Sequence, residues 1–465
     1  MRSYLETFHS SKTPWEVFQA VHASSPACFF LDSPQYAPPD QVYSYIGMDP
    51  EIEVSLEKGR LTISGEEKGN YPAAQLFPQL RRLLKQKGDR HLLKNKRSQS
   101  QAPFFTGGLV GYLGYETASL CDKVSFRPKK ELGILEAYFG LFRNVIVYDH
   151  KERIYYLAIN PRDSSLGTRD SQKLKSCFEK SMKAEPRFHL KKIEPEISRG
   201  HFEKIVRRAK EYIAAGDIYQ ANLSQRFNFG FRGSALALYD RLRSINPSPF
   251  SSFFKIRDLQ LVSSSPERLI RKIGNLCETR PIAGTCPAYG PEKKLQEWKK
   301  KLLQNPKERA EHLMLVDLER NDLGRVCDFR SVKVDEFMTL EKYSYVVHIV
   351  SKIVGRLKKG KDCFDLIKAM FPGGTITGCP KIRCMEIIDE LEPVRRGIYT
   401  GSLGYIDLRG DMDLNIVIRT IVLKNGRGHL QVGAGIVYDS DPKKEYEETL
   451  HKAEALMRAL TEASA

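Results

Sequence analysis

The sequence lacks any long hydrophobic run. No apolar segment approaches the roughly 20 residues that a membrane-spanning helix requires. Residues 1–21, MRSYLETFHSSKTPWEVFQAV, contain no apolar core of the kind found in secretory signal peptides. We therefore expect a cytoplasmic protein with no membrane partner. The 465 residues, 41% of them hydrophobic, are enough for two or three domains.

Paired cysteine motifs are also absent. The nine cysteines are scattered and odd in number, and no CxxC pair is matched by a second one. This pattern argues against a disulfide framework or a structural zinc site. It indicates free thiols in a reducing compartment.

Common nucleotide-binding signatures are missing. The sequence has no GxGxxG motif, and GGTITG at residues 373–378 lacks the Lys-Ser/Thr of a phosphate-binding loop. There is no internal repeat. A nucleotide cofactor is therefore not expected.

Acidic residues are fewer than basic ones, 57 against 74, and the formal net charge is +17. Such a charge can indicate binding to nucleic acid, because lysine and arginine neutralise phosphates. The basic clusters at residues 81–101, 292–309 and 355–362, however, lack interleaved aromatic residues and any recognisable binding motif. We expect a solvated basic surface that attracts an anionic substrate and no nucleic-acid partner. A basic nucleic-acid-binding protein is the alternative from another class.

The chain is best divided near residues 182–200, which contain two prolines and mixed charge. We expect one domain at residues 1–190 and a second, chemically active domain at residues 198–460. Before the boundary, residues 143–159 predict a hairpin. Helices and strands mix without regular βαβ alternation, so the sequence predicts an α+β fold with large antiparallel sheets.

A helix over residues 201–217 and a strand over residues 218–229 are predicted directly after the boundary. The helical segment repeats apolar residues with the period of one buried stripe. The strand segment, IYQANLSQRFNF, alternates apolar and polar residues, so its polar side chains share one face. That polar face would form a site only if another part of the chain covered it.

Two pairs of glutamates stand in the first turns of two predicted helices, which begin at Pro306 and Pro442. The pairs are Glu308 with Glu311 and Glu445 with Glu448. Each pair alone is explained by favourable interaction with the helix dipole. Together they are hard oxygen ligands without nearby cysteine or several histidines, a combination that suits magnesium.

Other segments carry isolated polar residues among apolar or small ones. Glu267 in SSSPERLI could act as a general acid if burial raised its pKa, or it could be an ordinary surface carboxylate. The stretches at residues 278–287, 396–405 and 432–437 combine glycines with apolar residues. Glycines that allow close backbone approach, together with an arginine in MDLNIVIRT, suit a substrate that carries carboxylates.

Together these segments resemble the chorismate-binding enzymes. This family includes anthranilate synthase component I, aminodeoxychorismate synthase component I, isochorismate synthase and salicylate synthase. The resemblance covers residues 200–460 through ordered motifs that include IYQANLSQ, SPERLI, RPIAGT, ERAEHLMLVDLERNDLGRV, FPGGTITGCPKIRC and GAGIVYDSDP. Residues 1–190 are similar to the N-terminal domain more loosely. The resemblance implies large antiparallel sheets in a sandwich flanked by helices, chorismate as substrate and Mg²⁺ as cofactor.

The resemblance also implies roles for individual residues. Glu311 and Glu448 correspond to the magnesium ligands, and Glu308 and Glu445 to their neighbours that order metal-bound water. The residues implied to bind substrate are Tyr399, Arg419, Gly433, Ala434 and Gly435 at the enolpyruvyl carboxylate, and Gly284, Thr285 and Thr375 around the ring. The implied catalytic residues are Glu267 as general acid, His348 near the ring and Gln220 beside the nucleophile.

Sequence differences within the family favour one product. Family members that use water are expected to have a lysine base where this chain has Gln220, which favours ammonia as the nucleophile. QANLSQR, FPGGTITG and NPSPFSSFF favour aminodeoxychorismate synthase over anthranilate synthase, the alternative. Ala283 departs from those aminodeoxychorismate synthases that have a covalent lysine there. No glutaminase module is apparent, so a separate glutamine amidotransferase subunit is the expected partner that supplies ammonia.

A second pocket is implied in the N-terminal domain, where aminating members of the family often bind tryptophan. FFLDSPQ and YSYIG resemble its wall. The residues implied to form it are Ser33, Ser44, Pro249, Phe250 and Ser251.

Overall fold

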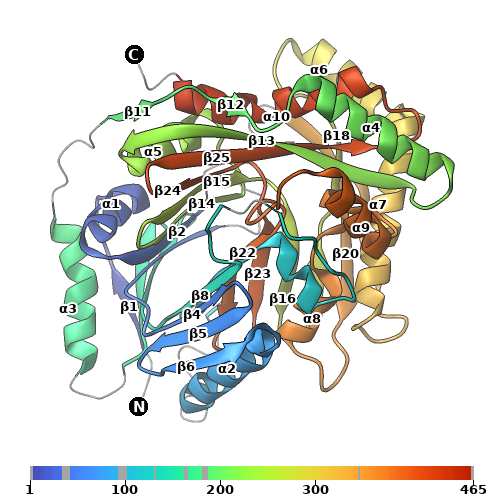
Figure 1. The fold of residues 1–465 in the computed structure, drawn as a ribbon. Helices are drawn as coiled ribbons and strands as arrows, with labels where there is room; N and C mark the ends of the chain where they lie inside the picture. The colour runs from blue at the N-terminus through green and yellow to red at the C-terminus, as the bar shows by residue number, and fades with distance from the viewer. Residues whose placement is uncertain are drawn as a thin grey trace.

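Two large antiparallel sheets form the centre of the protein (Figure 1). The computed structural model describes residues 4–33, 42–92, 102–129, 132–161, 166–180, 187–343 and 346–461. Ten α-helices lie in these ranges and flank the sheets. The α+β sandwich expected from the sequence is confirmed.

The first sheet has 13 strands. Its strands, in spatial order, are β1 (Tyr4–Phe8), β10 (Ile154–Ile159), β9 (Val145–Asp149), β3 (Tyr43–Met48), β2 (Ala27–Asp32), β14 (Phe250–Ile256), β15 (Leu259–Ser265), β24 (Thr420–Lys424), β25 (Arg427–Ile436), β13 (Gln220–Gly233) and β11 (Phe188–Leu190), with β12 (Glu194–Pro195) and β21 (Gly378–Cys379) also paired to β13.

The second sheet has 12 strands. Its strands, in spatial order, are β18 (Ile282–Pro287), β20 (Val346–Arg356), β17 (Leu276–Thr279), β16 (Arg268–Ile273), β23 (Met412–Ile416), β22 (Ser402–Asp407), β7 (Gly108–Leu113), β8 (Ala137–Phe142), β4 (Ile52–Glu57), β5 (Arg60–Gly65) and β6 (Gly69–Pro72), with β19 (Lys333–Tyr343) also paired to β20.

The helices cover the outer faces of the sheets. They are α1 (Pro14–Ser24), α2 (Leu76–Leu92), α3 (Leu166–Glu179), α4 (Arg199–Ala214), α5 (Ala235–Ile245), α6 (Glu292–Gln304), α7 (Pro306–Gly324), α8 (Cys363–Met370), α9 (Lys381–Leu391) and α10 (Pro442–Thr461). None of these helices is both long and apolar enough to cross a membrane.

Three apolar clusters explain the layered arrangement. One joins residues of both sheets, such as Phe29, Tyr112 and Phe254, and fills the interior of the sandwich. A second packs α1, α5 and α10 against the first sheet, and a third packs α2, α7 and α8 against the second sheet. Burying both faces of each sheet is the main source of stability in such a fold. All nine cysteines are free thiols, as the sequence indicated.

The local predictions around the site are confirmed. The hairpin at residues 143–159 is β9 paired with β10, and α4 covers most of the predicted helix at 201–217. Asn305 caps α7, whose first residue is Pro306. Asp441 accepts hydrogen bonds from two backbone N–H groups in the first turn of α10. These caps set where the two pairs of glutamates lie.

The two segments on either side of residues 190–198 both contribute strands to both sheets. β2 pairs with β14 in the first sheet, and β7 pairs with β22 in the second. The division into domains at this point stays a prediction, but the sheets are continuous across it.

Candidate active site

The two pairs of glutamates meet in space. α7 packs against β18 and β20, and α10 packs against β25 and α4. Burial and the nearby charges of Glu308 and Glu448 raise the pKa of Glu311. Burial and the charge of Glu448 also raise the pKa of Glu445. Because these effects act across two helices, the four carboxylates form one acidic cluster.

The acidic cluster borders two glycines of the sheets. A Cβ atom on Gly284 in β18 would lie 2.9 Å from Glu308 Oε2, and one on Gly435 in β25 would lie 3.7 Å from Glu311 Oε1. Because these glycines have no side chains, the carboxylates can lie close to the strand backbones. The acidic cluster therefore borders β18 and β25, which contain other predicted residues.

The residues of this cluster fit a magnesium ion by their chemistry. No group of three or more histidine, cysteine, aspartate or glutamate side chains has metal-binding geometry within the described ranges. Magnesium, however, usually takes one or two protein carboxylates and completes its shell with water and substrate oxygens. Glu311 and Glu448, one from each helix, match that requirement. The mutual repulsion of the carboxylates would be relieved by a cation.

Glu267 lies between β15 and β16 and is only 6% exposed. Burial raises the pKa of its carboxyl to about 7, although Thr375, Lys452 and Arg419 act in the opposite direction. Its Oε1 atom has no hydrogen-bond partner within the described ranges. The carboxyl can therefore hold a proton at neutral pH, as a general acid requires.

His348 lies in β20 opposite Thr285 of β18. Its Nδ1 atom lies 3.0 Å from the carbonyl oxygen of Gly284 and 3.0 Å from the Thr285 hydroxyl. Since a carbonyl oxygen can only accept, Nδ1 carries the proton and Nε2 is the unprotonated nitrogen. Burial and the charge of Arg419 lower the pKa of His348 to about 4. The ring is therefore neutral, and the buried Nε2 has no partner in the described part of the chain.

Arg419 precedes β24 in a left-handed backbone conformation, with φ of 49°. Burial lowers the pKa of its guanidinium, and Glu267 is the neighbour whose charge opposes that shift. Within the described ranges the guanidinium forms no hydrogen bond or ion pair with another side chain. A partly buried arginine that forms no hydrogen bond or ion pair with another described side chain is suited to bind a carboxylate of a ligand.

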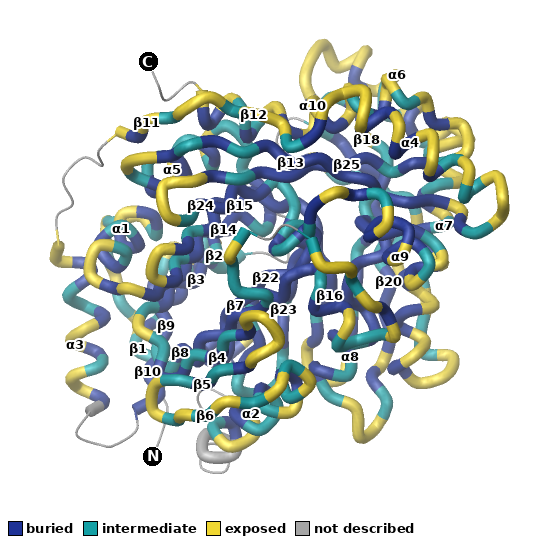
Figure 2. The backbone as a smooth tube through the Cα atoms, in the orientation of Figure 1, coloured by how far each residue is buried: buried dark blue, intermediate teal, exposed yellow. Residues whose placement is uncertain are grey.

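The polar face of β13 is covered by other parts of the chain. The sequence alone did not predict whether this face would be covered. Gln220 and Asn222 are 3% and 8% exposed. Figure 2 shows β13 and β25 buried over much of their length. A Cβ atom on Gly433 in β25 would lie 2.4 Å from Asn222 Oδ1 and 2.8 Å from the Tyr399 hydroxyl. Asn222 and Tyr399 therefore converge over this glycine.

The remaining predicted residues lie along the same face. Thr375 is in the short 3-10 helix Gly374–Ile376, and its hydroxyl is buried. Ala434 sits between Gly433 and Gly435, and its side chain packs into a core cluster on the other side of β25. Ala434 can therefore contribute only its backbone to the site. The structure thus brings together the residues predicted around the magnesium ion, the ring and the enolpyruvyl carboxylate.

Sequence reasoning missed Lys452 and the buried pair Glu392–Arg396. Lys452 Nζ lies 2.8 Å from Glu448 and donates to the Gly433 carbonyl at 3.1 Å. Arg396 forms a 2.7 Å ion pair with Glu392 and donates to the Asn222 carbonyl at 2.5 Å. The position of Lys452 four residues after Glu448 was a usable signal. The Glu392–Arg396 pair gave no such signal, because both residues follow the end of α9 at Leu391 and do not lie on a helix.

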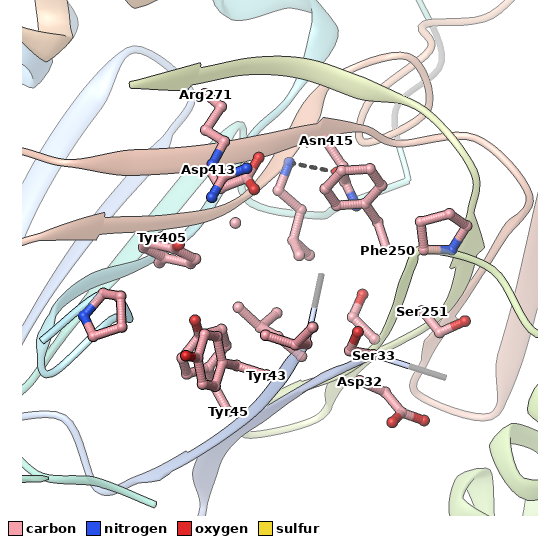
Figure 3. Close-up of a pocket in the computed structure, with 17 residues that line it drawn as sticks. Asp32, Ser33, Tyr43, Tyr45, Phe250, Ser251, Arg271, Tyr405, Asp413 and Asn415 are labelled. Carbon is pink, nitrogen blue, oxygen red and sulfur yellow. Dashed lines mark hydrogen bonds between the residues drawn. The ribbon is translucent and has the colours of Figure 1, made fainter. Parts of the chain in front are cut away.

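A second pocket lies between the two sheets, away from the acidic cluster (Figure 3). Ser33, Pro249, Phe250 and Ser251 line it, as the sequence predicted. Ser44 does not line it. The Ser44 hydroxyl accepts a hydrogen bond from the Ser33 backbone N–H and therefore supports the wall from behind.

The sequence did not predict the other end of this pocket. Figure 3 shows Arg271 and Asp413 together there, with Tyr405 beside them and Tyr43 and Tyr45 along one side. A cationic and an anionic side chain next to aromatic rings suit an amino acid with an apolar or aromatic side chain.

Comparisons with known proteins identify the family. A family model described as chorismate binding enzyme matches residues 26–458. Aminodeoxychorismate synthase component 1 of Bacillus subtilis is 40% identical over 430 residues, which are 90% of this chain and 89% of that protein. Anthranilate synthase component 1 of Aquifex aeolicus is 44% identical over 372 residues, which are 77% of this chain and 75% of that protein.

A solved structure is similar over nearly the whole fold. Anthranilate synthase component I from Streptococcus pneumoniae has a TM-score of 0.79 and 32% identity, covering 92% of this chain and 94% of that chain. The names of the similar proteins are divided between two reactions.

Proposed function

The chain belongs to the chorismate-binding enzyme family, and from this premise we propose that it converts chorismate to 4-amino-4-deoxychorismate as component I of an aminodeoxychorismate synthase. The product is a precursor of 4-aminobenzoate in folate biosynthesis. The Bacillus subtilis relative named for this activity is 40% identical over 90% of the chain. The presence of Asn222 and the FPGGTITG motif supports the same choice.

One observation supports the proposal that the substrate carries carboxylates. Arg419 is partly buried, forms no side-chain hydrogen bond or ion pair in the described ranges, and has Glu267 as its charged neighbour. We infer that Arg419, with the Tyr399 hydroxyl, binds the enolpyruvyl carboxylate. The ring carboxylate would then point towards Glu311 and Glu448. Fixing both ends of the substrate orients C4 for reaction.

The chain's own residues would then perform the following steps. Glu267 donates its proton to the departing C4 hydroxyl, which leaves as water. His348, neutral and held by Gly284, offers Nε2 as an acceptor beside the ring. The buried site excludes bulk water from these groups. Magnesium, held by Glu311 and Glu448, would supply positive charge to offset the substrate's negative charge.

Ammonia is the proposed nucleophile, and a separate glutamine amidotransferase subunit is its proposed source. Gln220 and Asn222, in place of a basic side chain, support ammonia over water. Ala283 cannot form a covalent bond with the substrate, so the amine must add directly. Free ammonium at high pH is expected to replace the partner in vitro.

Identification of the product tests the proposal. The protein is incubated with chorismate, magnesium and ammonium, and products are separated with and without an added aminodeoxychorismate lyase. We expect 4-aminobenzoate only when the lyase is present. Anthranilate fluorescence without the lyase would instead establish anthranilate synthase activity, the alternative that the Aquifex aeolicus relative's name supports. The absence of any chorismate consumption would refute both.

We further propose that the pocket of Figure 3 binds tryptophan. Phe250 would contact the ligand's indole ring, and the charged end of the pocket, formed by Arg271 and the Arg268–Asp413 ion pair, would face its amino-acid group. Calorimetric titration with tryptophan is expected to show binding that weakens about tenfold or more in Phe250→Ala, because a large buried aromatic contact is lost. Glycine, which has no ring, is the control ligand. Equal binding of tryptophan by wild type and variant would contradict the placement.

A further inference from the structure

Two amide side chains on β13 have buried oxygen atoms that accept no hydrogen bond. Gln220 Oε1 and Asn222 Oδ1 both lack a partner within the described ranges. A buried acceptor without a donor destabilises the folded state, and such atoms are rare in folded proteins. Glu267 Oε1 and His348 Nε2 share this property and lie in the same site. The two amide oxygens and His348 Nε2 are therefore acceptors available to a bound ligand.

The neighbouring strand β25 has glycines where these amides pack against it. Asn222 pairs with Gly435, and the next residue on the same face of β25 is Gly433. A Cβ atom on Gly435 would lie 2.5 Å from Gln220 Nε2, and one on Gly433 would lie 2.4 Å from Asn222 Oδ1. Any larger residue at either glycine would therefore displace an amide. The two glycines form the floor beneath the two amides.

The amides also stand between the two ends of the proposed substrate site. The Gln220 end adjoins Glu311 across Gly435, and the Asn222 end adjoins the Tyr399 hydroxyl across Gly433. Residues two apart on a strand lie roughly 7 Å apart. A small nucleophile bound beside these amides would therefore face the middle of a substrate that spans from Glu311 to Tyr399.

The chemistry of an amide oxygen favours ammonia over water. Ammonia is nucleophilic in its neutral form and needs acceptors for its N–H groups so that its lone pair points at carbon. Water must lose a proton to become an equally strong nucleophile, and an amide oxygen accepts a hydrogen bond but does not take up the proton. Two amide oxygens thus suit the first nucleophile and not the second.

Resting on the proposed function, we infer that Asn222, acting with Gln220, binds and orients the ammonia molecule that attacks chorismate. The Asn222 backbone is held in place for this task, because its carbonyl accepts the hydrogen bond from buried Arg396. Asn222 would thus bind the nitrogen nucleophile, whereas Arg419 and Tyr399 would bind the enolpyruvyl carboxylate of chorismate.

Separate Michaelis constants for ammonium and chorismate test the inference. In Asn222→Leu the side chain keeps its approximate shape and loses its acceptor. We expect the KM for ammonium to rise about tenfold or more, as the loss of a hydrogen bond in a buried site predicts. The KM for chorismate is expected to stay within about twofold. An unchanged KM for ammonium, or an equal rise in both constants, would overturn the inference.

Two further variants guard against misfolding and indirect effects. Asn222→Ser is smaller and keeps an oxygen acceptor, so it is expected to give a smaller rise in the KM for ammonium and decides the question if Asn222→Leu does not fold. Asn228→Leu is the matched control, because Asn228 lies on the same face of β13 and bonds Glu196 and His429. It should leave the ratio of the two constants unchanged, and a change as large as that of Asn222→Leu would overturn the inference.

The failure of this inference differs from failure of the proposed function. A wild-type protein that consumes no chorismate with ammonium refutes the function. A wild-type protein that aminates chorismate, with Asn222 variants that behave like the control, refutes the role of Asn222 alone. If the product is anthranilate, ammonia is still the nucleophile and the same comparison applies.

Discussion

Glu448→Gln is expected to abolish magnesium-dependent turnover and to leave the fold intact. The side chain is 48% exposed, and it forms an ion pair with Lys452 on the same helix. Its removal should therefore cost little stability. Its charge, however, is one of the two proposed to bind magnesium, and an amide oxygen is a weaker ligand for a hard cation. We expect magnesium affinity to fall about 100-fold or more.

Magnesium affinity is measured by calorimetry and turnover by chorismate consumption, with thermal unfolding as the check on the fold. Glu447→Gln is the matched control. Glu447 is the adjacent residue of α10 and contacts Arg199, outside the acidic cluster. It should keep wild-type affinity. Wild-type magnesium affinity and activity in Glu448→Gln would remove Glu448 from the metal site.

Glu267→Gln is expected to lower kcat by about 100- to 10,000-fold, the range for loss of a general acid. The amide occupies nearly the same volume but cannot donate a carboxylic proton to the leaving hydroxyl. In the wild-type protein, kcat/KM should fall as pH rises through about 7, because burial raises the pKa of Glu267 to about 7. The profile is measured at a constant concentration of free ammonia. A variant that retains wild-type kcat would exclude Glu267 as the acid.

The same group makes stability depend on pH. The ordinary pKa of the carboxyl is 4.5, and the folded state raises it to about 7. Between these values the unfolded chain releases the proton while the folded protein retains it, so the free energy of unfolding falls as pH rises. Below about pH 4.5 the carboxyl is protonated in both states, so the free energy of unfolding no longer depends on its titration. Above about pH 7 the loss of stability is complete.

Glu267→Gln should remove this loss of stability. The melting temperature of Glu267→Gln minus that of the wild type is therefore expected to be larger at about pH 8 than at about pH 5. An identical difference in melting temperature at both values would contradict the raised pKa. The measurement needs no substrate and is thus independent of the proposed reaction.

Much of the site could be predicted from the sequence because its parts are local. Pro306 and Pro442 begin helices wherever those helices pack, and their capping residues fix the first turns that contain the glutamates. The alternation of IYQANLSQ places Gln220 and Asn222 on one face of any strand that it forms. The resemblance to chorismate-binding enzymes rests on such segments, and the family is confirmed by the match over residues 26–458.

Other features could not be predicted because they depend on contacts between distant segments. The charge of Arg419 lowers the pKa of His348 although the two residues lie far apart in sequence. The lining of the second pocket combines Ser33 with Arg271 and Asp413, which three separate strands bring together. Ser44 resembled a wall residue in sequence, yet it alternates along β3 with Tyr43 and Tyr45, which line the pocket, and therefore lies behind the wall.

The sequence by itself determined the α+β class, the order of the motifs and the helix turns that present Glu308, Glu311, Glu445 and Glu448. Local propensity and capping act over a few residues, so these features needed no knowledge of packing. Only the tertiary structure decided that the polar face of β13 is buried, that Arg419 forms no ion pair with another described residue and that Asn222 lies over a glycine. Burial and proximity set the pKa of Glu267 and leave its Oε1 and Asn222 Oδ1 without hydrogen-bond partners among the residues that the structure describes. These properties arise from segments that meet only after the two sheets have formed.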